Sequence, residues 1–518
     1  MLGDSDRSAR ARLGRRRTGA LGRRLAWLAA IVPILLVADV AQSAMFTNVG
    51  PRLPTNVGPR GPTLNSVGPR FDPTFRTTPG GGDYGTGVGT SSGGGSNAGN
   101  ANSGGSGGSA TTRSHTASRR GHSNIPPGSE RRYIPDEIVV EYGGSDQQLI
   151  GLLNRFRLSR LDSRRIALIN TTFYRLRILD GSSVPTKLRA LDADSLVRTA
   201  QPNYLFETVQ GATPVVPAQA DQAAGEQVGG AAAQAADTAT QYAVAKLRLG
   251  EAHTLARGDQ VLVAVVDSGI DTTHPALTGV VEKSFDALGS NEGPHSHGTA
   301  IAGLIAGHAR LIGAAPAVRI LAARAFSASQ GSTVSIIAAI DWATGQGARV
   351  INMSFAGPSD PALERVLAAA HQKNVVLVAA AGNAGPKSPP LWPAADPNVI
   401  AVTATDYDDR LYPMANRGKH VAIAAPGVDI LVAQPGDAYK MESGTSFSAA
   451  FVSGVAALVL QRKPQLGADA VKKVLLSTAH DLGPKGRDDL FGAGLMDAFQ
   501  AVSTVEKPTD AALQVPAH

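Results

Sequence analysis

The chain has 518 residues, of which 43% are apolar, and it contains no cysteine. At roughly 100–200 residues per domain, this length predicts two or three folded units, or one large unit with extensions. The lack of cysteine excludes disulfide-stapled modules, zinc-finger arrays, thiol proteases and iron–sulfur proteins. The net charge of +7 comes from the start of the chain, because residues 1–132 hold 17 Lys and Arg against 6 Asp and Glu. A nucleic-acid-binding domain carries its excess charge on a folded surface, so we expect no nucleic-acid partner.

Residues 1–44 have the layout of a secretory signal peptide. An arginine-rich stretch at residues 7–24 precedes an apolar run at residues 25–40 and the small residues 41–44. Pro33 and Asp39 interrupt this run, and it is shorter than the roughly 20 residues that a membrane-spanning helix needs. We therefore expect cleavage and export, to the medium, the periplasm or the cell surface. A retained membrane anchor is the alternative.

Residues 45–132 show no sustained apolar period. The sequence Val-Gly-Pro-Arg occurs three times, and residues 80–109 are rich in glycine and serine. Such a tract cannot bury enough apolar surface to offset its chain entropy. It is predicted to be a disordered tether that holds a folded unit away from a membrane or cell surface. Basic repeats that bind an anionic surface are the alternative.

A small α+β unit is predicted at residues 133–209. Residues 137–142, 174–178 and 203–209 have the pattern of strands, and residues 147–156 and 184–199 have helical spacing. This unit holds no candidate catalytic cluster. An Ala/Gln-rich linker is predicted at residues 210–240.

Residues 241–505 are predicted to form a doubly wound α/β domain, followed by a tail at residues 506–518. Apolar runs at residues 261–266, 350–353, 375–378 and 399–402 are typical of strands that are buried on both faces of a parallel sheet. Helical segments such as 335–344 and 361–372 supply the crossovers. In this architecture, ligands bind at the carboxyl ends of the strands.

Three polar residues lie at such ends or at helix starts, and each has a simple structural explanation when taken alone. Asp267 follows a buried strand, where a carboxylate commonly caps a loop. His297 begins a helix of small residues, and His295 beside it allows a metal-ligand interpretation. Ser446 precedes an apolar helix at residues 447–460, where serine is commonly a cap.

Together, Asp267, His297 and Ser446 are the minimum set for nucleophilic acyl transfer. A serine hydroxyl is a weak nucleophile at neutral pH, so His297 would remove its proton and Asp267 would hold the imidazole tautomer. A metallohydrolase using His295 and His297 would lack a Glu or a third ligand at helical spacing. No metal site is therefore predicted.

Residues 241–505 resemble the subtilisin-like serine peptidases. The motifs that carry the resemblance lie at residues 265–271, 274–275, 297–299, 351–354, 381–383, 425–427 and 444–446. The chain order Asp, His, Ser is also that of the family. The resemblance implies a three-layer αβα fold, polypeptide substrates, the triad Asp267, His297 and Ser446, and an oxyanion hole formed by the Asn383 amide and the backbone N–H of Ser446.

Residues 133–209 resemble the propeptide of these enzymes, a ferredoxin-like fold that assists folding and whose last strand occupies the substrate cleft. The resemblance implies an exported serine endopeptidase that is made as a precursor and inhibited by its own propeptide. The alternative is a surface-binding protein whose peptidase fold has lost activity. A degenerate triad or a missing Asn383 would favour that alternative, but every chemical position is filled.

The chain departs from the family pattern at three places. The loop that usually binds calcium is shortened, and Ala276 stands where a carboxylate is usual, so we expect that catalysis requires no cofactor. The helix after the nucleophile usually reads Met-Ala-Ser/Thr-Pro, whereas this chain has Phe447-Ser448-Ala449-Ala450.

The substrate residue before the scissile bond is expected to lie between two uncharged stretches. These comprise Ser354, Phe355, Ala356 and Gly357 on one side and Ala379, Ala380, Ala381 and Gly382 on the other, with Leu391 near the base of the pocket. An apolar preference follows. Ala356 at a usual glycine position is expected to reduce the room for the largest aromatic side chains.

Overall fold

The computed structural model describes residues 122–209 and 241–505. The predictions for residues 1–44, for residues 45–121 of the tether, for the linker at 210–240 and for the tail at 506–518 lie outside the described residues. Among the residues that the structure describes, none of the helices combines the length and the hydrophobicity that spanning a membrane requires.

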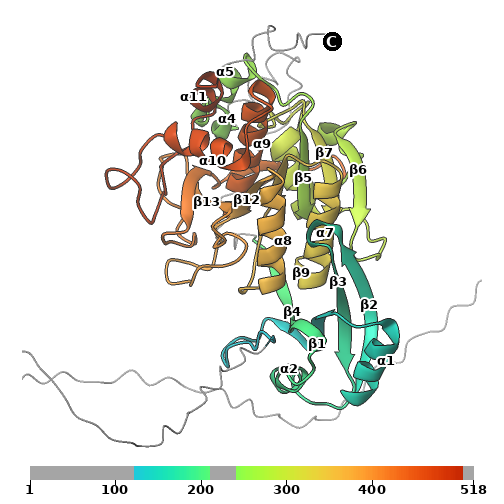
Figure 1. The fold of residues 1–518 in the computed structure, drawn as a ribbon. Coiled ribbons are helices and arrows are strands. Elements are labelled where there is room, and N and C mark those ends of the chain that lie inside the picture. The colour runs from blue at the N-terminus through green and yellow to red at the C-terminus, as the bar shows by residue number, and fades with distance from the viewer. Residues whose placement is uncertain (1–121, 210–240, 506–518) are drawn as a thin grey trace, which may run out of the picture. The chain divides into compact units, whose positions relative to one another are not determined.

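The N-terminal unit is an antiparallel sheet packed against two helices (Figure 1). Its elements in chain order are β1 (Tyr133–Tyr142), α1 (Asp146–Arg155), β2 (Leu158–Ile166), η1 (Ala167–Ile169), β3 (Thr171–Ile178), α2 (Val184–Leu191) and β4 (Val197–Thr208). The strand order β2-β3-β1-β4 places the first strand of the unit between β3 and the last strand, β4. Alternate residues of β1, such as Ile138 and Val140, face the helices and join the core of this unit.

Two details of this unit differ from the prediction. The sequence pattern does not indicate β2, because residues 158–166 are mostly polar and only their ends are buried. The helix predicted at 184–199 ends at Leu191, and Val197 already belongs to β4. Residues 197–201 become extended because they pair with β1, a contact between segments that are distant in sequence.

The end of the predicted disordered tether is ordered in the structure. Residues 122–132 run beside β4, where Ser123 forms a bridge to Ala200 and the backbone N–H of Asn124 donates to the Ala200 carbonyl at 2.7 Å. Backbone hydrogen bonds hold this segment, and Ile125 packs against the core of the unit without a repeating apolar pattern. A search for apolar periodicity therefore misses it.

The second unit contains a seven-stranded sheet in which every neighbouring pair is parallel, which confirms the predicted doubly wound fold. Its strands in spatial order are β14 (Val421–Pro426), β13 (Val399–Thr405), β12 (Val376–Ala380), β10 (Val350–Met353), β5 (Leu262–Asp267), β7 (Arg319–Arg324) and β6 (Val281–Asp286).

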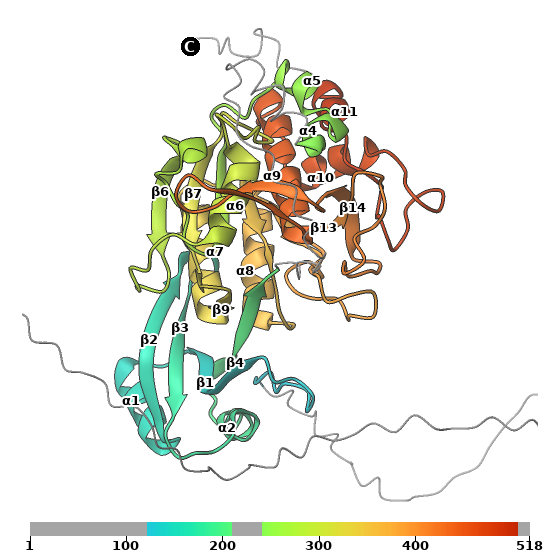
Figure 2. The same ribbon diagram turned by 180° about the vertical axis from the view of Figure 1, so that it is seen from behind.

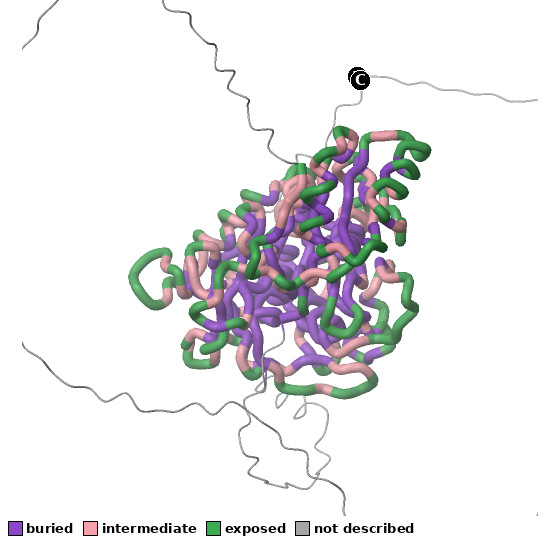
Figure 3. The backbone as a smooth tube through the Cα atoms, turned by 90° about the horizontal axis from the view of Figure 1, so that it is seen from below, coloured by how far each residue is buried: buried purple, intermediate pink, exposed green. Residues whose placement is uncertain are grey.

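Helices cover both faces of this sheet. Those on one face are α6 (Ser296–Ala306), α9 (Thr445–Arg462) and α10 (Ala468–Ser477), and those on the other are α7 (Thr333–Gly345) and α8 (Pro361–Gln372). Figure 1 shows α7 and α8 in front of the sheet, and Figure 2 shows α6 from behind. In β5, Val263 and Val265 join one core while Ala264 and Val266 join the other, which explains the unbroken apolar run. Buried backbone fills the interior in Figure 3.

Shorter elements complete the unit. They are α4 (Tyr242–Lys246), α5 (Leu249–His253), η2 (Pro275–Leu277), β8 (Phe326–Ser327), β9 (Gln330–Ser332), β11 (Phe355–Ala356), β15 (Ile430–Ala433), β16 (Tyr439–Glu442) and α11 (Ala498–Ser503). The strand β4 pairs with β9 and β11 as well as with β1, so the sheet of the N-terminal unit continues into the second unit.

Candidate active site

Asp267 and His297 form a hydrogen-bonded pair at the carboxyl end of the central sheet. Asp267 is the last residue of β5, and His297 lies in the first turn of α6. The Nδ1 atom of His297 lies 2.8 Å from Oδ1 of Asp267, and both side chains are almost completely buried. A buried carboxylate at Nδ1 favours the tautomer that leaves Nε2 unprotonated, which is the form a general base requires.

The other nitrogen of His297, Nε2, is buried and has no hydrogen-bond partner among the described residues. A buried polar atom without a partner is costly in a folded protein. The unpaired Nε2 is therefore available as a proton acceptor on the side of the ring that faces away from Asp267.

Ser446 lies in the first turn of α9 and is fully buried. Its hydroxyl donates to the carbonyl oxygen of Val209 at 2.7 Å, and a second acceptor, the carbonyl oxygen of Ser354, lies at 3.3 Å. Val209 directly follows β4 of the N-terminal unit. A carbonyl from the chain's own N-terminal unit is thus held against the candidate nucleophile.

Asn383 contacts the same carbonyl oxygen. Its Nδ2 donates to Val209 O at 3.3 Å, while its Oδ1 accepts from the backbone N–H and the hydroxyl of Thr445 at 3.1 and 2.9 Å. The two bonds from Thr445 fix the amide so that its N–H groups face the carbonyl. The family motif points to this residue, and the structure brings it together with Ser446.

The strand β4 lies between two short strands of the second unit. Thr208 pairs with Phe355 and Glu207 with Ala356 on β11, while Phe206 pairs with Gly331 on β9. The backbone N–H of Val209 donates to Ser354 O at 3.1 Å, which extends the β11 pairing up to the carbonyl at Ser446. This is recognition of an extended peptide by strand addition.

The side chain of Phe206 fills an aromatic pocket in the second unit. It is fully buried, with its ring centroid 6.0 Å from that of Phe355, and Phe355 in turn lies 4.9 Å from Phe326. A Cβ atom on Gly357 would lie 2.2 Å from the Phe206 ring, so glycine is required for this close approach. The sequence motifs include Phe355 and Gly357 without indicating that they receive an aromatic side chain.

A cavity of about 470 Å³ lies beside Val209. The second unit lines it with the uncharged residues Gln330, Ala356, Asn383, Ala384 and Leu391, and the N-terminal unit contributes the charged residues Arg131, Arg132 and Glu207. Sequence reasoning misses Ala384, because it follows the motif at 381–383. Three of the other predicted substrate-binding residues are buried. Ala379 and Ala380 are the last two residues of the buried strand β12, and Ala381, which follows them, is fully buried. The backbone N–H of Gly382 donates to the Thr445 hydroxyl at 3.2 Å.

Asp360 joins the two units away from the candidate triad. It caps α8 and is fully buried, and its carboxylate accepts from Gln201 of β4 and from Thr333 of α7, both at 2.6 Å. Burial raises the pKa of Asp360 despite these hydrogen bonds. Nothing in the motifs singles out this residue, since an Asp before Pro361 is an ordinary helix start.

Comparisons with known proteins match both units of this fold. A family model described as the Subtilase family matches residues 258–494, and a model described as the fervidolysin N-terminal prodomain matches residues 121–203. The thermophilic serine proteinase of Bacillus sp. (strain AK1) is 35% identical over 383 residues, which cover 72% of this chain and 88% of that relative. Subtilisin DY of Bacillus licheniformis is 36% identical over 254 residues, which cover 47% of this chain and 92% of the relative.

A solved structure resembles both units. The crystal structure of fervidolysin from Fervidobacterium pennivorans, described as a keratinolytic enzyme related to subtilisin, matches with a TM-score of 0.62 and 26% identity. The match covers 75% of this chain and 63% of the fervidolysin chain, so this chain spans less than two thirds of that structure. With a relative this similar over most of both sequences, the chain belongs to the subtilase family, as a subtilisin-like serine protease with an N-terminal prodomain.

Proposed function

We propose that the chain is the precursor of a serine endopeptidase that uses Ser446 as nucleophile, His297 as general base and Asp267 as the partner that orients the imidazole. The observation that carries this proposal is the Val209 carbonyl, which receives hydrogen bonds from both Ser446 and Asn383 beside the His297–Asp267 pair. The prodomain thereby occupies the position of a substrate.

In the proposed reaction, Ser446 Oγ attacks the carbonyl carbon of the substrate while His297 Nε2 takes the hydroxyl proton. The negative charge that develops on the carbonyl oxygen is stabilised by Asn383 Nδ2 and the backbone N–H of Ser446. An asparagine amide with this role is already known in subtilisins, so the importance of Asn383 follows from family precedent. His297 then gives its proton to the leaving amine, and water hydrolyses the acyl-enzyme.

The first bond cleaved by this mechanism is Val209–Gln210. Ser446 and Asn383 both donate to the Val209 carbonyl, and the peptide bond of that carbonyl leads to Gln210. After this cleavage, β4 remains paired with β9 and β11 and acts as an inhibitor until the prodomain leaves.

The prodomain also suggests which substrates are preferred. Counted back from the cleaved bond, Val209 is the first residue and Phe206 is the fourth. The uncharged cavity wall formed by Ala356, Ala384 and Leu391 supports an apolar residue directly before the cleaved bond. The pocket of Phe326, Phe355 and Gly357 supports an aromatic residue at the fourth position.

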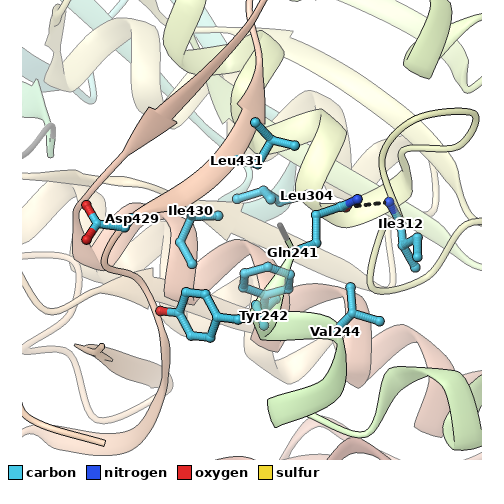
Figure 4. A pocket seen from close by; sticks show the side chains of 10 residues that line it. Gln241, Tyr242, Val244, Leu304, Ile312, Asp429, Ile430 and Leu431 are labelled. Atoms are coloured by element: carbon cyan, nitrogen blue, oxygen red, sulfur yellow. Dashed lines mark hydrogen bonds between the residues drawn. The ribbon is translucent and has the colours of Figure 1, made fainter. Parts of the chain in front are cut away.

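Catalysis is proposed to require no metal ion. Ala276, at the position where the family usually has a carboxylate, is fully buried and packs with Leu311 and Ala433. The side chain of Gln241 holds the neighbouring short loop by accepting from the Ile312 backbone N–H at 2.9 Å (Figure 4). It also donates to the Arg310 carbonyl at 3.0 Å. Protein hydrogen bonds and apolar contacts thus stabilise this region.

Export is proposed from the sequence of residues 1–44, where arginines, an apolar run and small residues follow one another. An extracellular or periplasmic location suits a precursor that is inhibited until its prodomain is removed. Attachment to a membrane or cell surface through residues 1–132 is the alternative that the sequence leaves open.

The test is the hydrolysis of casein and of a peptide carrying Phe-Glu-Thr-Val before the cleaved bond. Wild-type protein should cleave both, and Ser446→Ala should lose activity by about 10⁴-fold or more, because no acyl-enzyme can form. Ser477→Ala, on the exposed part of α10, is the matched control and should retain full activity. Full activity of Ser446→Ala in a preparation free of other proteases would contradict the proposed nucleophile.

A further inference from the structure

A second histidine, His295, lies two residues before His297 and contacts Ser268, the residue that follows Asp267. His295 is the N-cap residue of α6, and its Nδ1 lies 3.2 Å from the hydroxyl oxygen of Ser268. Ser268 directly follows Asp267 and donates to Asp267 Oδ1 from its hydroxyl at 3.1 Å and from its backbone N–H at 2.7 Å. The two histidines are therefore connected through Ser268 and Asp267.

The Ser268 hydroxyl has one proton and two lone pairs, and the structure provides a partner for each. Its proton goes to Asp267, because a carboxylate only accepts. One lone pair accepts from the backbone N–H of Gly298 at 3.1 Å. The remaining lone pair faces His295, which fits the tautomer in which Nδ1 of His295 carries the proton and donates it to Ser268.

One other contact competes for the same nitrogen. The backbone N–H of His297 lies 3.4 Å from Nδ1 of His295, and this contact would require an unprotonated Nδ1. It is longer than the contact to Ser268, and accepting it would turn the Ser268 proton away from Asp267. The arrangement in which His295 donates leaves every polar atom of Ser268 satisfied.

The surroundings favour the uncharged form of His295. Burial lowers the pKa of His295, and the nearby His297 and Arg324 act in the same direction, against the negative charges of Asp267 and Glu292. A neutral imidazole can still donate from Nδ1. It does so without placing a second positive charge next to the imidazolium that forms on His297 during catalysis.

We propose that His295 is a positioning residue that holds the Ser268 hydroxyl so that its proton is directed at Asp267. Asp267 Oδ1 accepts from His297 Nδ1 and from both donors of Ser268, whereas Oδ2 has no partner among the described residues. The orientation of the carboxylate toward His297 thus depends on contacts to one oxygen, and Ser268 supplies two of them. This inference rests on the proposed role of the triad.

The experiment is a double-mutant cycle on the mature enzyme with a peptide substrate. His295→Ala should lower kcat about tenfold with KM changed less than about twofold, because it frees the Ser268 hydroxyl while His295 does not line the cavity beside Val209. Ser268→Ala should have a similar effect, and His295→Ala added to Ser268→Ala should cause no further loss. His295→Asn, whose side-chain amide can donate to Ser268 and cap α6, should restore kcat to within about twofold.

Three results would overturn the inference. The first is that His295→Ala lowers kcat by the same factor in the wild type and in the Ser268→Ala variant. The second is that His295→Ala changes only KM. The third is that His295→Asn fails to restore kcat although its melting temperature equals that of the wild type. A purely structural cap would give additive losses that follow the melting temperature. An active Ser446→Ala protein would instead overturn the proposed function, so the two failures are distinguishable.

Discussion

Phe447 occupies the position directly after the nucleophile, where the family commonly has methionine. Its side chain is buried, and its ring centroid lies 6.4 Å from that of His297. A methionine at this position becomes a polar sulfoxide beside the reacting centre when it is oxidised. Phenylalanine has no sulfur, and the chain has no cysteine.

We therefore expect that mild peroxide leaves turnover largely intact, whereas Phe447→Met makes the enzyme sensitive. Both proteins are treated identically, and residual kcat is measured. Met441, which is 40% exposed, oxidises in both proteins and serves as an internal control. Rapid inactivation of the unmodified enzyme would show that Met441 or another residue governs sensitivity.

Gly357 makes room for the Phe206 ring, which occupies the proposed fourth substrate position. Because an added Cβ would lie 2.2 Å from the Phe206 ring, Gly357→Ala should lower kcat/KM about 10- to 100-fold for peptides with Phe at this position. Peptides with Ala there should be affected less than about threefold. Comparing kcat/KM for the two peptides checks this, and an equal loss for both would mean that the substitution disturbs β11 instead.

At the scale of residues, the candidate triad could be predicted because each of its members follows a buried strand or begins a helix, and their chain order matches a known family. Asn383 is implied only by the resemblance to that family. The pocket for Phe206 could not be predicted in the same way. It is formed by Phe326, Phe355 and Gly357 from different segments, and only the pairing of β4 with β9 and β11 brings a side chain into it. The sequence suggests His295 only as a metal-ligand candidate, since the hydroxyl of Ser268 cannot be recognised as its partner until the fold is known.

At the scale of elements, an ion pair connects β1 of the prodomain with α8. Arg365 Nη1 donates to Glu141 Oε2 at 2.7 Å. Burial alone would raise the pKa of Glu141, but hydrogen bonds from Thr171 and Arg365 and the charges of Arg365 and Arg198 outweigh it and lower the pKa. Thr171 and Arg198 belong to the prodomain itself, so the complex supplies only the contribution of Arg365 to this lowering of the pKa. The Arg365 contact stabilises the complex while Glu141 is ionised, and this contribution is lost as the pH falls through the lowered pKa and Glu141 becomes protonated.

The cleaved prodomain should therefore dissociate faster at about pH 4 than at about pH 7, and Glu141→Gln should speed dissociation at the higher pH. Size-exclusion chromatography of the processed complex at both pH values measures the released prodomain. The ratio between the two pH values should be smaller in Glu141→Gln than in the wild type, a comparison that cancels the contribution of other carboxylates such as Asp360. An unchanged ratio would exclude Glu141 as the source of acid sensitivity.

Strands that pair with distant segments are the hardest elements to predict. The segment after Leu191 continues a helical pattern locally, but its backbone hydrogen bonds go to β1, about 60 residues earlier in the chain. By contrast, the apolar runs of the parallel sheet are buried on both faces and can be recognised directly. Local pattern thus predicts an element best where burial, rather than pairing, determines its conformation.

At the scale of the whole molecule, stability should not depend on a metal ion at the short loop near Ala276. EDTA should leave the melting temperature of the mature enzyme unchanged. Gln241→Ala should lower it by several degrees, because it removes hydrogen bonds to Ile312 and Arg310 that are worth about 1–3 kcal/mol together. A large decrease with EDTA, reversed by calcium, would contradict this proposal.

The most direct measurement is the intact mass of the first products of the purified precursor, followed in parallel for the wild type and for Ser446→Ala. We predict one early cut in the wild type, giving a fragment that ends at Val209 and a fragment that begins at Gln210, because the Val209 carbonyl lies against Ser446 and Asn383. Ser446→Ala should remain uncut at this bond. An early cut at another bond, or cleavage of Ser446→Ala at Val209–Gln210 without another protease, would contradict self-cleavage by the proposed triad.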